Sequence, residues 1–430
     1  MRNVVVAQSG GPTAVINASL LGVIHACRSM PGRFGRLYAA RHGIEGLLYE
    51  ELLDLSSQEE AELDLLRTTP AAGAIGTCRY KIGRDATQDV ERILEVLAAH
   101  GIGAFFYIGG NDSMDTAQRV SDAARERGLD LVCTGIPKTI DNDLGDDERI
   151  VIDHTPGYGS AARYWASLVL ELNEENRGSS PADPVLVAQA MGRRIGYLAA
   201  AARLADPDRT MPLQIYLPEA GVSLPEIAEN VEGELRRSGR VIVVVSEGIG
   251  IGDLGERRDA FGHAAFGSSR GSVAQALVNF LNDRGLPVRG AARGQIPGTH
   301  QRHAILCASP VDLDEAYEVG RHAVEIAVRD GTGYMATIVR NLGPDYRPAY
   351  GKAPLRRMAG SERRFPREWI AASRCDVTDA FVTYARPLIG EGYPEVPLRR
   401  GLPRFAQLRS DCVPKRLSPY TPEAYREADR

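Results

Sequence analysis

Acids and amides gather directly after two short apolar runs of the chain. FFYIG at 105–109 and LVCTGIP at 131–137 each end in a loop dense in glycine, carboxylates and amides. Apolar runs of this length with such endings are typical of buried parallel strands, and open α/β sheets bind ligands just past the carboxyl ends of such strands. The pattern therefore predicts one cleft, lined by Asn111, Asp112, Ser113, Asp141 and Asp143.

Carboxylates beside glycine-rich loops suit the transfer of a phosphoryl group. That reaction needs little covalent chemistry from the protein, because Mg²⁺ and cationic side chains offset the phosphate charge and a base accepts the proton of the attacking hydroxyl. We expect the carboxylates of Asp141 and Asp143 to point in different directions, so that one acts as base while the other holds metal directly or through water. In isolation, the same Asp-Asn-Asp sequence is also typical of a structural Asx turn.

Cationic side chains for such a reaction would come from other loops. Arg79 and Lys81 lie in a glycine-flanked loop at 75–81, although a solvated surface turn is the structural alternative. A β-branched run at 4–7 leads through Gly10-Gly11 into an apolar helix, which leaves backbone N–H groups available for a phosphate. That turn alone is equally compatible with a plain tight turn, since it matches neither common phosphate-binding glycine motif.

Strands and helices alternate through most of the chain, which predicts an α/β fold. Further strands at 185–190, 213–216 and 241–245 each end in a charged residue or in a polar turn with glycine, and helices are expected at 88–99, 224–238, 271–283 and 312–329. This alternation predicts two doubly wound, Rossmann-like α/β lobes with the active site in the cleft between them. We expect a first lobe at 1–152, completed by about 303–342, and a second lobe at 153–302. A polar connector between lobes is expected at 171–184, and a C-terminal extension packed on the body at 343–430.

The segment 250–255 matches the GxGxxG pattern of dinucleotide-binding sites. The next residues are Glu256-Arg257-Arg258-Asp259, a poor start for an apolar helix, and no acid stands at the offset of roughly 20 residues that a ribose contact needs. We therefore expect a loop without a dinucleotide here.

Composition limits the possible partners and compartment. The net charge of −5 and the pI of about 6.0 argue against binding to nucleic acid or to a membrane surface, both of which favour a basic excess. The six cysteines show no CxxC pairing, so neither a zinc site nor a disulfide framework is expected. No apolar stretch has the length of a signal peptide or a bilayer span, and we expect a cytoplasmic protein.

Motifs along the chain resemble, in order and spacing, those of the phosphofructokinases. They are GGNDS at 109–113, PKTIDND at 137–143, MGR at 191–193, SEG at 246–248 and PGTHQR at 297–302. The resemblance runs from QSGGPTAVIN near the N-terminus to at least residue 340, and with YARPLIG it covers nearly the whole chain. It favours a catalytic role for Asp141 over a plain turn.

The resemblance implies that the first lobe binds the phosphoryl donor and the second lobe the sugar phosphate, and it implies a role for each matching residue. Asp141 would be the base for the 1-hydroxyl of the sugar, assisted by Lys138 and Arg79 at the transferred group. Arg293 and Arg302 would clamp the sugar's 6-phosphate, because a guanidinium makes bidentate contacts to phosphate. The remaining implied contacts are with the phosphoryl donor (Gly11, Asp112 and Ser113), with sugar and Mg²⁺ (Thr139 and Asp143), and with the sugar pocket (Met191, Gly192, Arg193 and Glu247).

Two positions indicate which phosphoryl donor is used. ATP-dependent members of the family typically have glycine in place of Asp112, and many have glycine in place of Lys138, whereas pyrophosphate-dependent members have Asp and Lys there. The two side chains would occupy the space and the charge position of the α-phosphate of ATP, and Lys138 would pair with a terminal pyrophosphate oxygen. Some ATP-dependent members also carry the lysine, so Asp112 discriminates most, and Lys81 favours the same donor.

The sequence departs from the family pattern at two places. Asn111 stands where the family generally has a metal-binding Asp, so Mg²⁺ would depend on Asp112, Asp115 or Asp143. Thr299 replaces the usual His or Tyr, and either Thr299 or the adjacent His300 could contact the sugar.

The resemblance thus implies a reversible reaction, in which pyrophosphate and fructose 6-phosphate give phosphate and fructose 1,6-bisphosphate with Mg²⁺. It also implies a homodimer or homotetramer in which a neighbour supplies arginines such as Arg293. Two alternatives stay open: a kinase that uses ATP or acts on a related sugar phosphate such as sedoheptulose 7-phosphate, and a non-catalytic regulatory subunit. Asn111 makes the second conceivable, but the catalytic residues implied by the resemblance are all present.

Overall fold

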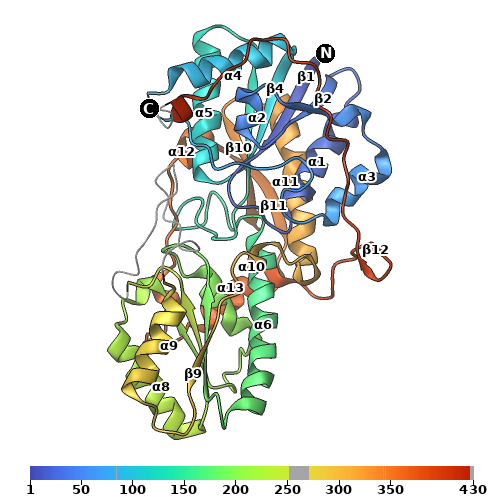
Figure 1. Cartoon of the computed structure of the whole chain (residues 1–430). Helices are drawn as coiled ribbons and strands as arrows, with labels where there is room; N and C mark the ends of the chain where they lie inside the picture. Colours follow the sequence, from blue (N-terminus) through green and yellow to red (C-terminus); the bar gives the residue numbers. More distant parts are fainter. Residues whose placement is uncertain (84, 251–270, 342, 344, 427–430) are drawn as a thin grey trace.

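The chain forms two α/β lobes joined side by side, shown in the computed structural model of Figure 1. The structure describes residues 1–430 except 84, 251–270, 342, 344 and 427–430. Most of the GxGxxG segment at 250–255 lies outside the described residues. No helix in the described part of the chain has the length and apolar character needed to cross a bilayer.

The first lobe is built on a seven-stranded sheet with the order β11-β10-β5-β4-β1-β2-β3. Its five inner strands run parallel, and the edge strands β3 and β11 are antiparallel to their neighbours. Alternate residues of β1 belong to two apolar clusters on opposite faces, as the period of a strand requires. The strands are β1 (Arg2–Gln8), β2 (Phe34–Ala40), β3 (Leu52–Asp54), β4 (Ile102–Gly109), β5 (Val132–Pro137), β10 (Tyr334–Arg340) and β11 (Pro348–Pro354).

Helices cover both faces of this sheet. One face packs against α1 (Ile16–Arg28) and α11 (Pro310–Arg329). The other packs mainly against α2 (Ile44–Leu48), α4 (Thr87–Ala99), α5 (Asn111–Glu126) and α12 (Leu355–Met358). The short helix α3 (Glu60–Asp64) lies at the outer edge of the lobe in Figure 1.

Helices α1 and α11 touch backbone to backbone. A Cβ atom on Gly22 would lie 2.0 Å from the carbonyl oxygen of Tyr317, and one on Gly320 would lie 2.2 Å from that of Ser19. No side chain fits at either position, so each glycine permits the close approach of the other helix.

The second lobe has a parallel four-stranded sheet with the order β7-β8-β6-β9. One face packs against α8 (Leu224–Ser238) and α9 (Val273–Arg284), and the other against α6 (Tyr158–Ser179) and α7 (Tyr197–Ala200). The strands are β6 (Val185–Ala190), β7 (Leu213–Tyr216), β8 (Val241–Ser246) and β9 (Ala292–Gln295). The predicted pair of doubly wound lobes is therefore confirmed.

The connector predicted at 171–184 is wrong, because its first half is the end of helix α6. Leu172, Asn173 and Asn176 are buried at helical spacing while the acids between them face outward. Asn176 Nδ2 also donates to the carbonyl of Asp183 at 3.0 Å, which ties the following turn to the helix. The chain instead passes between the lobes at 138–157, and returns through α10 (His300–His303).

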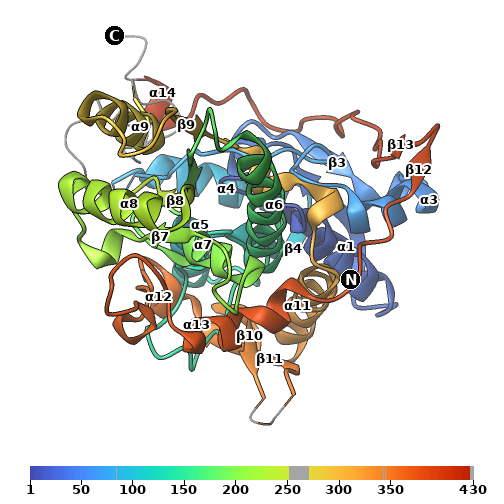
Figure 2. The ribbon, with the colours of Figure 1, turned by 90° about the horizontal axis from the view of Figure 1, so that it is seen from below.

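The segment after residue 343 contributes to both lobes. Its strand β11 pairs with β10 in the first sheet. Side chains from Phe365 to Leu388, around α13 (Asp379–Ala385), join the apolar cluster on α6 in the second lobe. The chain then passes the hairpin of β12 (Leu398–Arg399) and β13 (Leu402–Pro403) and returns to the first lobe, where it ends in α14 (Glu423–Arg426), as Figure 2 shows.

Candidate active site

A cleft with a cavity volume of about 490 Å³ lies where the two lobes meet. This volume is in the range of small-molecule sites. Residues of the first lobe that line it come from the ends of β1, β4 and β5 and from the loop before α4, and residues of the second come from the ends of β6 and β8 and from α10. The lining includes Gly11, Arg79, Lys81, Asn111, Asp112, Ser113, Lys138, Thr139, Asp141, Asp143, Met191, Arg193, Glu247, Thr299 and Arg302.

The acid loop, defined as residues 138–157, brings two carboxylates to this cleft. Asn142, between them, has a left-handed backbone (φ 58°), and its side chain turns into the core, where it bonds the hydroxyl of Tyr384 and the N–H of Thr155. Asp141 and Asp143 therefore lie on the same side, with oxygens 3.5 and 4.0 Å from the guanidinium of Arg193. The prediction that the two carboxylates point in different directions is wrong.

Arg363 supports the acid loop from inside the protein. Its side chain is fully buried and donates to the carbonyls of Leu144, Ile152 and Asp153 at 2.6–2.8 Å. Its backbone N–H donates to the carbonyl of Asp143. No local sequence signal marks Arg363, which lies about 200 residues from the loop that it holds.

The far end of the acid loop is held by a buried histidine. The two ring nitrogens of His154 lie 2.8 Å from a carboxylate oxygen of Asp153 and 2.7 Å from one of Glu315 on α11. Burial alone would lower the pKa of His154, but the two carboxylates raise it to about 10, so the ring is charged and bridges the acid loop to α11.

The cleft perturbs the ionisation of Asp141 and Lys138. Burial and the adjacent Asp143 raise the pKa of Asp141 to about 6. Burial lowers the pKa of Lys138 to about 7, although the charge of Asp141 opposes this change. A base and a cation that both titrate near neutral pH are typical of catalytic sites.

Lys138 and the loop after β1 form the floor of the cleft. The ammonium of Lys138 donates to the carbonyl of Gly11 at 2.8 Å, and a Cβ on Gly10 (φ 75°) would lie 3.2 Å from it. Ser113, in the first turn of α5, bonds Ser9 through their hydroxyls. The N-terminus of α5 thus faces the cleft, with a partial positive charge that favours an anion.

The cation loop, defined as residues 75–83, forms another wall. Its backbone joins the loop after β1 through a bridge of Ser9 and Cys78, and Gly10 N–H donates to the carbonyl of Cys78 at 2.9 Å. Burial alternates along it, since Cys78, Tyr80 and Ile82 are buried while Arg79 and Lys81 are exposed and line the cleft. Lys81 pairs with Asp112 at 2.6 Å across the cavity wall.

The wall from the second lobe is held by a glutamine that the sequence reasoning did not assign. Gln301 is buried, and its side-chain oxygen accepts from the backbone N–H of Met191 and from the indole of Trp165, both at 2.9 Å. Glu247 accepts from the backbone N–H of Arg193 at 3.0 Å, and burial raises its pKa to about 7. A Cβ on Gly248 would collide with the Arg193 carbonyl, so the SEG and MGR turns fit together only with glycine there.

Of the two arginines predicted to bind the sugar's 6-phosphate, Arg302 lines the cleft and Arg293 lies outside it. Arg302 reaches across the cleft to the first lobe, where a Cβ on Gly11 would lie 2.9 Å from its Nη1. Its Nε is buried without a hydrogen-bond partner among the described residues. Arg293 pairs with Asp183 outside the cleft of its own chain, and Gly192 shapes the turn (φ 126°) without lining the cavity.

Asn111 and Thr299, the departures from the family pattern, have defined positions. The side-chain amide of Asn111 donates to the carbonyl of Ser361, a bond that an ionised Asp could not make. Thr299 lines the cavity, whereas His300 faces α6 and contacts the hydroxyl of Tyr164 at 3.3 Å. Asp115 does not line the cavity.

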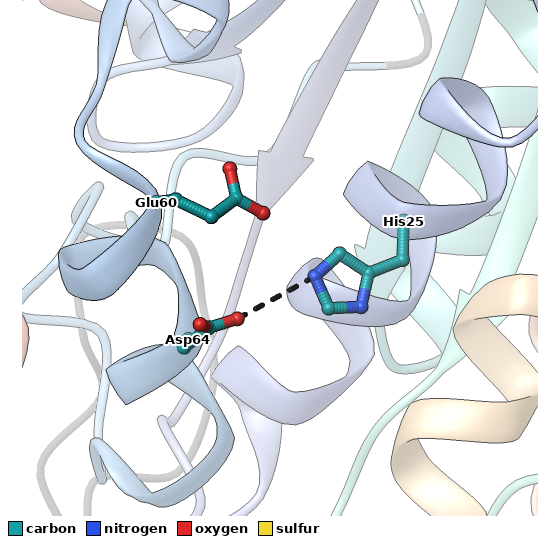
Figure 3. Close-up of side chains that lie close together, drawn as sticks. All are labelled: His25, Glu60 and Asp64. Carbon is teal, nitrogen blue, oxygen red and sulfur yellow. Dashed lines mark ion pairs between the residues drawn. The ribbon is translucent and has the colours of Figure 1, made fainter.

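Possible metal ligands occur inside and outside the cleft. Within the part of the chain that the structure describes, one group of three ligand atoms lies within 4.8 Å, and it consists of His25, Glu60 and Asp64 on the outer surface of the first lobe (Figure 3). Glu60 is already paired with Arg28. The cleft offers Asp112, Asp141 and Asp143 as more widely spaced acids, which suits Mg²⁺ held by one or two carboxylates together with substrate phosphates.

Comparisons with known proteins agree with this geometry. A family model described as Phosphofructokinase matches residues 3–327. A protein of Methylococcus capsulatus named pyrophosphate–fructose 6-phosphate 1-phosphotransferase is 39% identical over 97% of this chain and 98% of its own. Crystal structures titled pyrophosphate-dependent phosphofructokinase, from Marinobacter aquaeolei and Nitrosospira multiformis, are 36% and 37% identical, cover 98% of this chain and 100% of theirs, and superpose with TM-scores of 0.87 and 0.88.

Proposed function

The chain belongs to the phosphofructokinase family, and we propose that it transfers a phosphoryl group from pyrophosphate to the 1-hydroxyl of fructose 6-phosphate. The products are fructose 1,6-bisphosphate and phosphate. Because the phosphoanhydride consumed and the ester formed are comparable in free energy, the reaction runs in both directions. Relatives that match nearly the whole chain carry this activity in their names, which supports the proposal.

The observation that carries the choice of donor is the pair of charged side chains on the floor and wall of the cleft. Lys138 is buried with its ammonium at the carbonyl of Gly11, and Asp112 is paired with Lys81 at the wall. Both side chains occupy the space that the α-phosphate of a nucleotide would need, and they place their charges where its charge would lie. A short donor with charge at both ends fits between them, because its terminal oxygens meet Lys138 and the cation loop.

The proposed transfer uses residues that already face one another. Asp141 accepts the proton of the sugar 1-hydroxyl as its oxygen attacks the terminal phosphorus of pyrophosphate, and the bond from that phosphorus to the bridging oxygen breaks to release phosphate. Lys138 and Arg79 stabilise the negative charge of the transferred group, and Arg302 binds the 6-phosphate of the sugar. Arg193, whose guanidinium lies 3.5 Å from Asp141, favours the ionised form of the base.

The acids of the cleft fit a divalent metal, which we propose is Mg²⁺. Asp143 and Asp112 would hold it, directly or through water. When bound, it would offset the charge of the pyrophosphate oxygens. Asn111 offers no carboxylate to a metal, and the nitrogen of its side-chain amide is bonded to the carbonyl of Ser361.

Met191, Arg193, Glu247 and Thr299 form the proposed sugar pocket. Arg293 lies on the exposed side of β9, outside the cleft of its own chain. We therefore propose a homodimer or homotetramer, in which Arg293 of one subunit contacts the 6-phosphate bound by its neighbour. We also propose that the enzyme is cytoplasmic, where its six cysteines would stay reduced.

A donor panel tests the proposal directly. Purified protein with Mg²⁺ and fructose 6-phosphate is assayed with pyrophosphate and with ATP side by side, and sedoheptulose 7-phosphate is then tested as the alternative acceptor. We expect turnover with pyrophosphate to exceed that with ATP clearly. A preference for ATP would refute the choice of donor, and no turnover with either would favour the non-catalytic subunit.

A further inference from the structure

The direction of Arg79 and Lys81 depends on the buried residue between them. Buried and exposed side chains alternate along 78–82, and Tyr80 itself borders the cavity, so a shift of Tyr80 moves the flanking side chains with it. Tyr80 is 5% exposed and packs in the apolar cluster of the first lobe. The contacts that fix the position of Tyr80 therefore also determine where the side chains of Arg79 and Lys81 point.

Two residues from near the other end of the sequence, Ala424 and Tyr425, contact Tyr80. The ring of Tyr425 meets that of Tyr80 edge to face, with centroids 5.3 Å apart. The backbone N–H of Ala424 donates to the Tyr80 hydroxyl at 3.3 Å, and that hydroxyl donates to the carboxylate of Asp89. Tyr425 is itself bonded through its hydroxyl to Glu45.

Asp89 and the end of the chain cap each other. Asp89 is fully buried at the first turn of α4, and its Oδ1 accepts from the hydroxyl of Tyr420 at 2.7 Å and from the N–H of Glu423 at 3.1 Å. In return, its own N–H donates to the carboxylate of Glu423 at 3.0 Å. Each acid thus satisfies a free N–H at the start of the other helix, which closes one network around Tyr80.

The end of the chain does not need these contacts merely to lie on the lobe. Further upstream, the N–H of Leu417 donates to the buried carboxylate of Glu50 at 3.1 Å, and that of Val413 to the carbonyl of Leu52 at 2.8 Å. The path of the segment is therefore fixed before residue 420. Helix α14 then reaches the cation loop, where Ala424 and Tyr425 contact Tyr80.

We propose that residues 420–425, here the C-terminal clamp, are a positioning element for the phosphoryl donor: by fixing Tyr80 and Asp89 they aim Arg79 and Lys81 into the cleft. None of the clamp residues lines the cavity, so they act through the cation loop and not on the substrates. The clamp serves only the donor side of the cleft, since the sugar pocket is held by Gln301 and Glu247 in the other lobe. This inference rests on the proposed function for the identity of the donor.

Full-length variants of Tyr425 test the clamp. Tyr425→Ala removes the ring from Tyr80, whereas Tyr425→Phe keeps the ring and removes only the hydroxyl. Tyr393→Ala is the matched control, because Tyr393 belongs to the same C-terminal segment, is 80% exposed and contacts only Arg163 among the described aromatic and cation–π contacts. Tyr420→Phe, which deletes one hydrogen bond to Asp89 without a cavity, serves if Tyr425→Ala fails to fold.

The Michaelis constants separate positioning from general support. We expect Tyr425→Ala to raise KM for pyrophosphate about 10-fold while KM for fructose 6-phosphate changes less than about twofold, because only the donor side is displaced. Tyr425→Phe and Tyr393→Ala should match the parent, and Tyr420→Phe should raise only KM for pyrophosphate. An unchanged KM for pyrophosphate, or an equal rise in both constants, overturns the proposal.

Amide hydrogen exchange without substrates provides a readout independent of the activity. Exchange in residues 78–82 should be faster in Tyr425→Ala than in the parent and in Tyr425→Phe, with the acid loop unchanged. Equal exchange in 78–82 rejects the clamp whatever the donor is. Faster exchange in a protein that does not use pyrophosphate would retain the clamp and reject the proposed function.

Discussion

Two loops of the first lobe bring charges to the cleft, and they are held in opposite ways. The acid loop is fixed from within, because its backbone carbonyls accept from the buried side chain of Arg363 and its Asn142 points into the core. The cation loop alternates between core and cleft, and the last residues of the chain hold it from outside. The residue proposed as base thus occupies a buried, desolvated position, whereas the cations proposed to meet the donor depend on contacts with residues 420–425.

The largest effect should come from the acid loop itself. Asp141→Ser removes the proposed base, and we expect kcat to fall by roughly 10²–10⁴-fold, the usual contribution of general base catalysis. Asp130→Ser is the control, because Asp130 is exposed and does not line the cleft. Steady-state rates with pyrophosphate check this, and an unchanged kcat would refute the assignment of the base.

A smaller effect is expected where the donor is selected. In the double variant Asp112→Gly and Lys138→Gly, two charge-assisted contacts are lost, and kcat/KM for pyrophosphate should fall by about 10²-fold. Removing both side chains also opens space for the α-phosphate of ATP, so some ATP-dependent turnover should appear. If the kinetics with both donors stay as in the parent, the steric argument for the donor is wrong.

Arg363→Met tests the way in which the acid loop is held. Three buried carbonyls lose their donor, and we expect the free energy of unfolding to fall by about 3 kcal/mol. Arg364→Met is the matched control, because the neighbouring side chain is exposed. Urea denaturation measures both variants, and equal stability would show that the acid loop does not depend on Arg363. Tyr425→Ala should be less destabilising than Arg363→Met.

The smallest effect is a shift in pH dependence. Since the pKa of Asp141 is raised to about 6, the base is protonated below that pH, and kcat/KM should fall as the pH drops through about 6. Asp143→Asn removes the adjacent negative charge, which lowers the pKa of Asp141 and should move this acid limb down by about one pH unit. Profiles of kcat/KM against pH, normalised to each variant's maximum, check the shift. An acid limb that stays in place contradicts the electrostatic coupling of Asp141 with Asp143.

Elements with complete local signals could be predicted closely from the sequence. Helix α8 spans 224–238 as expected, because Ser223 and Glu226 form a capping box at its start and Gly239 ends it in a left-handed conformation. The strand β7 at 213–216 is also confirmed. In the site, the acids and glycines that follow β4 and β5 line one cleft, because the ends of parallel strands share an edge.

The parts that could not be predicted depend on contacts between distant residues. Nothing near Arg363 indicates that its guanidinium is buried under a loop about 200 residues earlier, and Gln301 stands in a recognised motif without a sign of its hydrogen bonds to Met191 and Trp165. The acids and asparagines of 171–184 are typical of a turn, but burial of Leu172, Asn173 and Asn176 on one side of the helix keeps residues 171–179 in α6. Four of the seven residues of strand β11 are proline, glycine or lysine, which are rare in central strands but tolerated at a sheet edge. The sequence pattern therefore did not indicate a strand there.

The contact of α1 with α11 at Gly22 and Gly320 has a consequence for biosynthesis. Helix α1 is translated almost 300 residues before its partner surface on α11, an interval of about 30 s at common elongation rates. Until then, the side of α1 that contacts α11 and the part of the first sheet that α11 covers stay exposed. The nascent chain should therefore depend on chaperones during that interval, and its first lobe should close only after the second has been made.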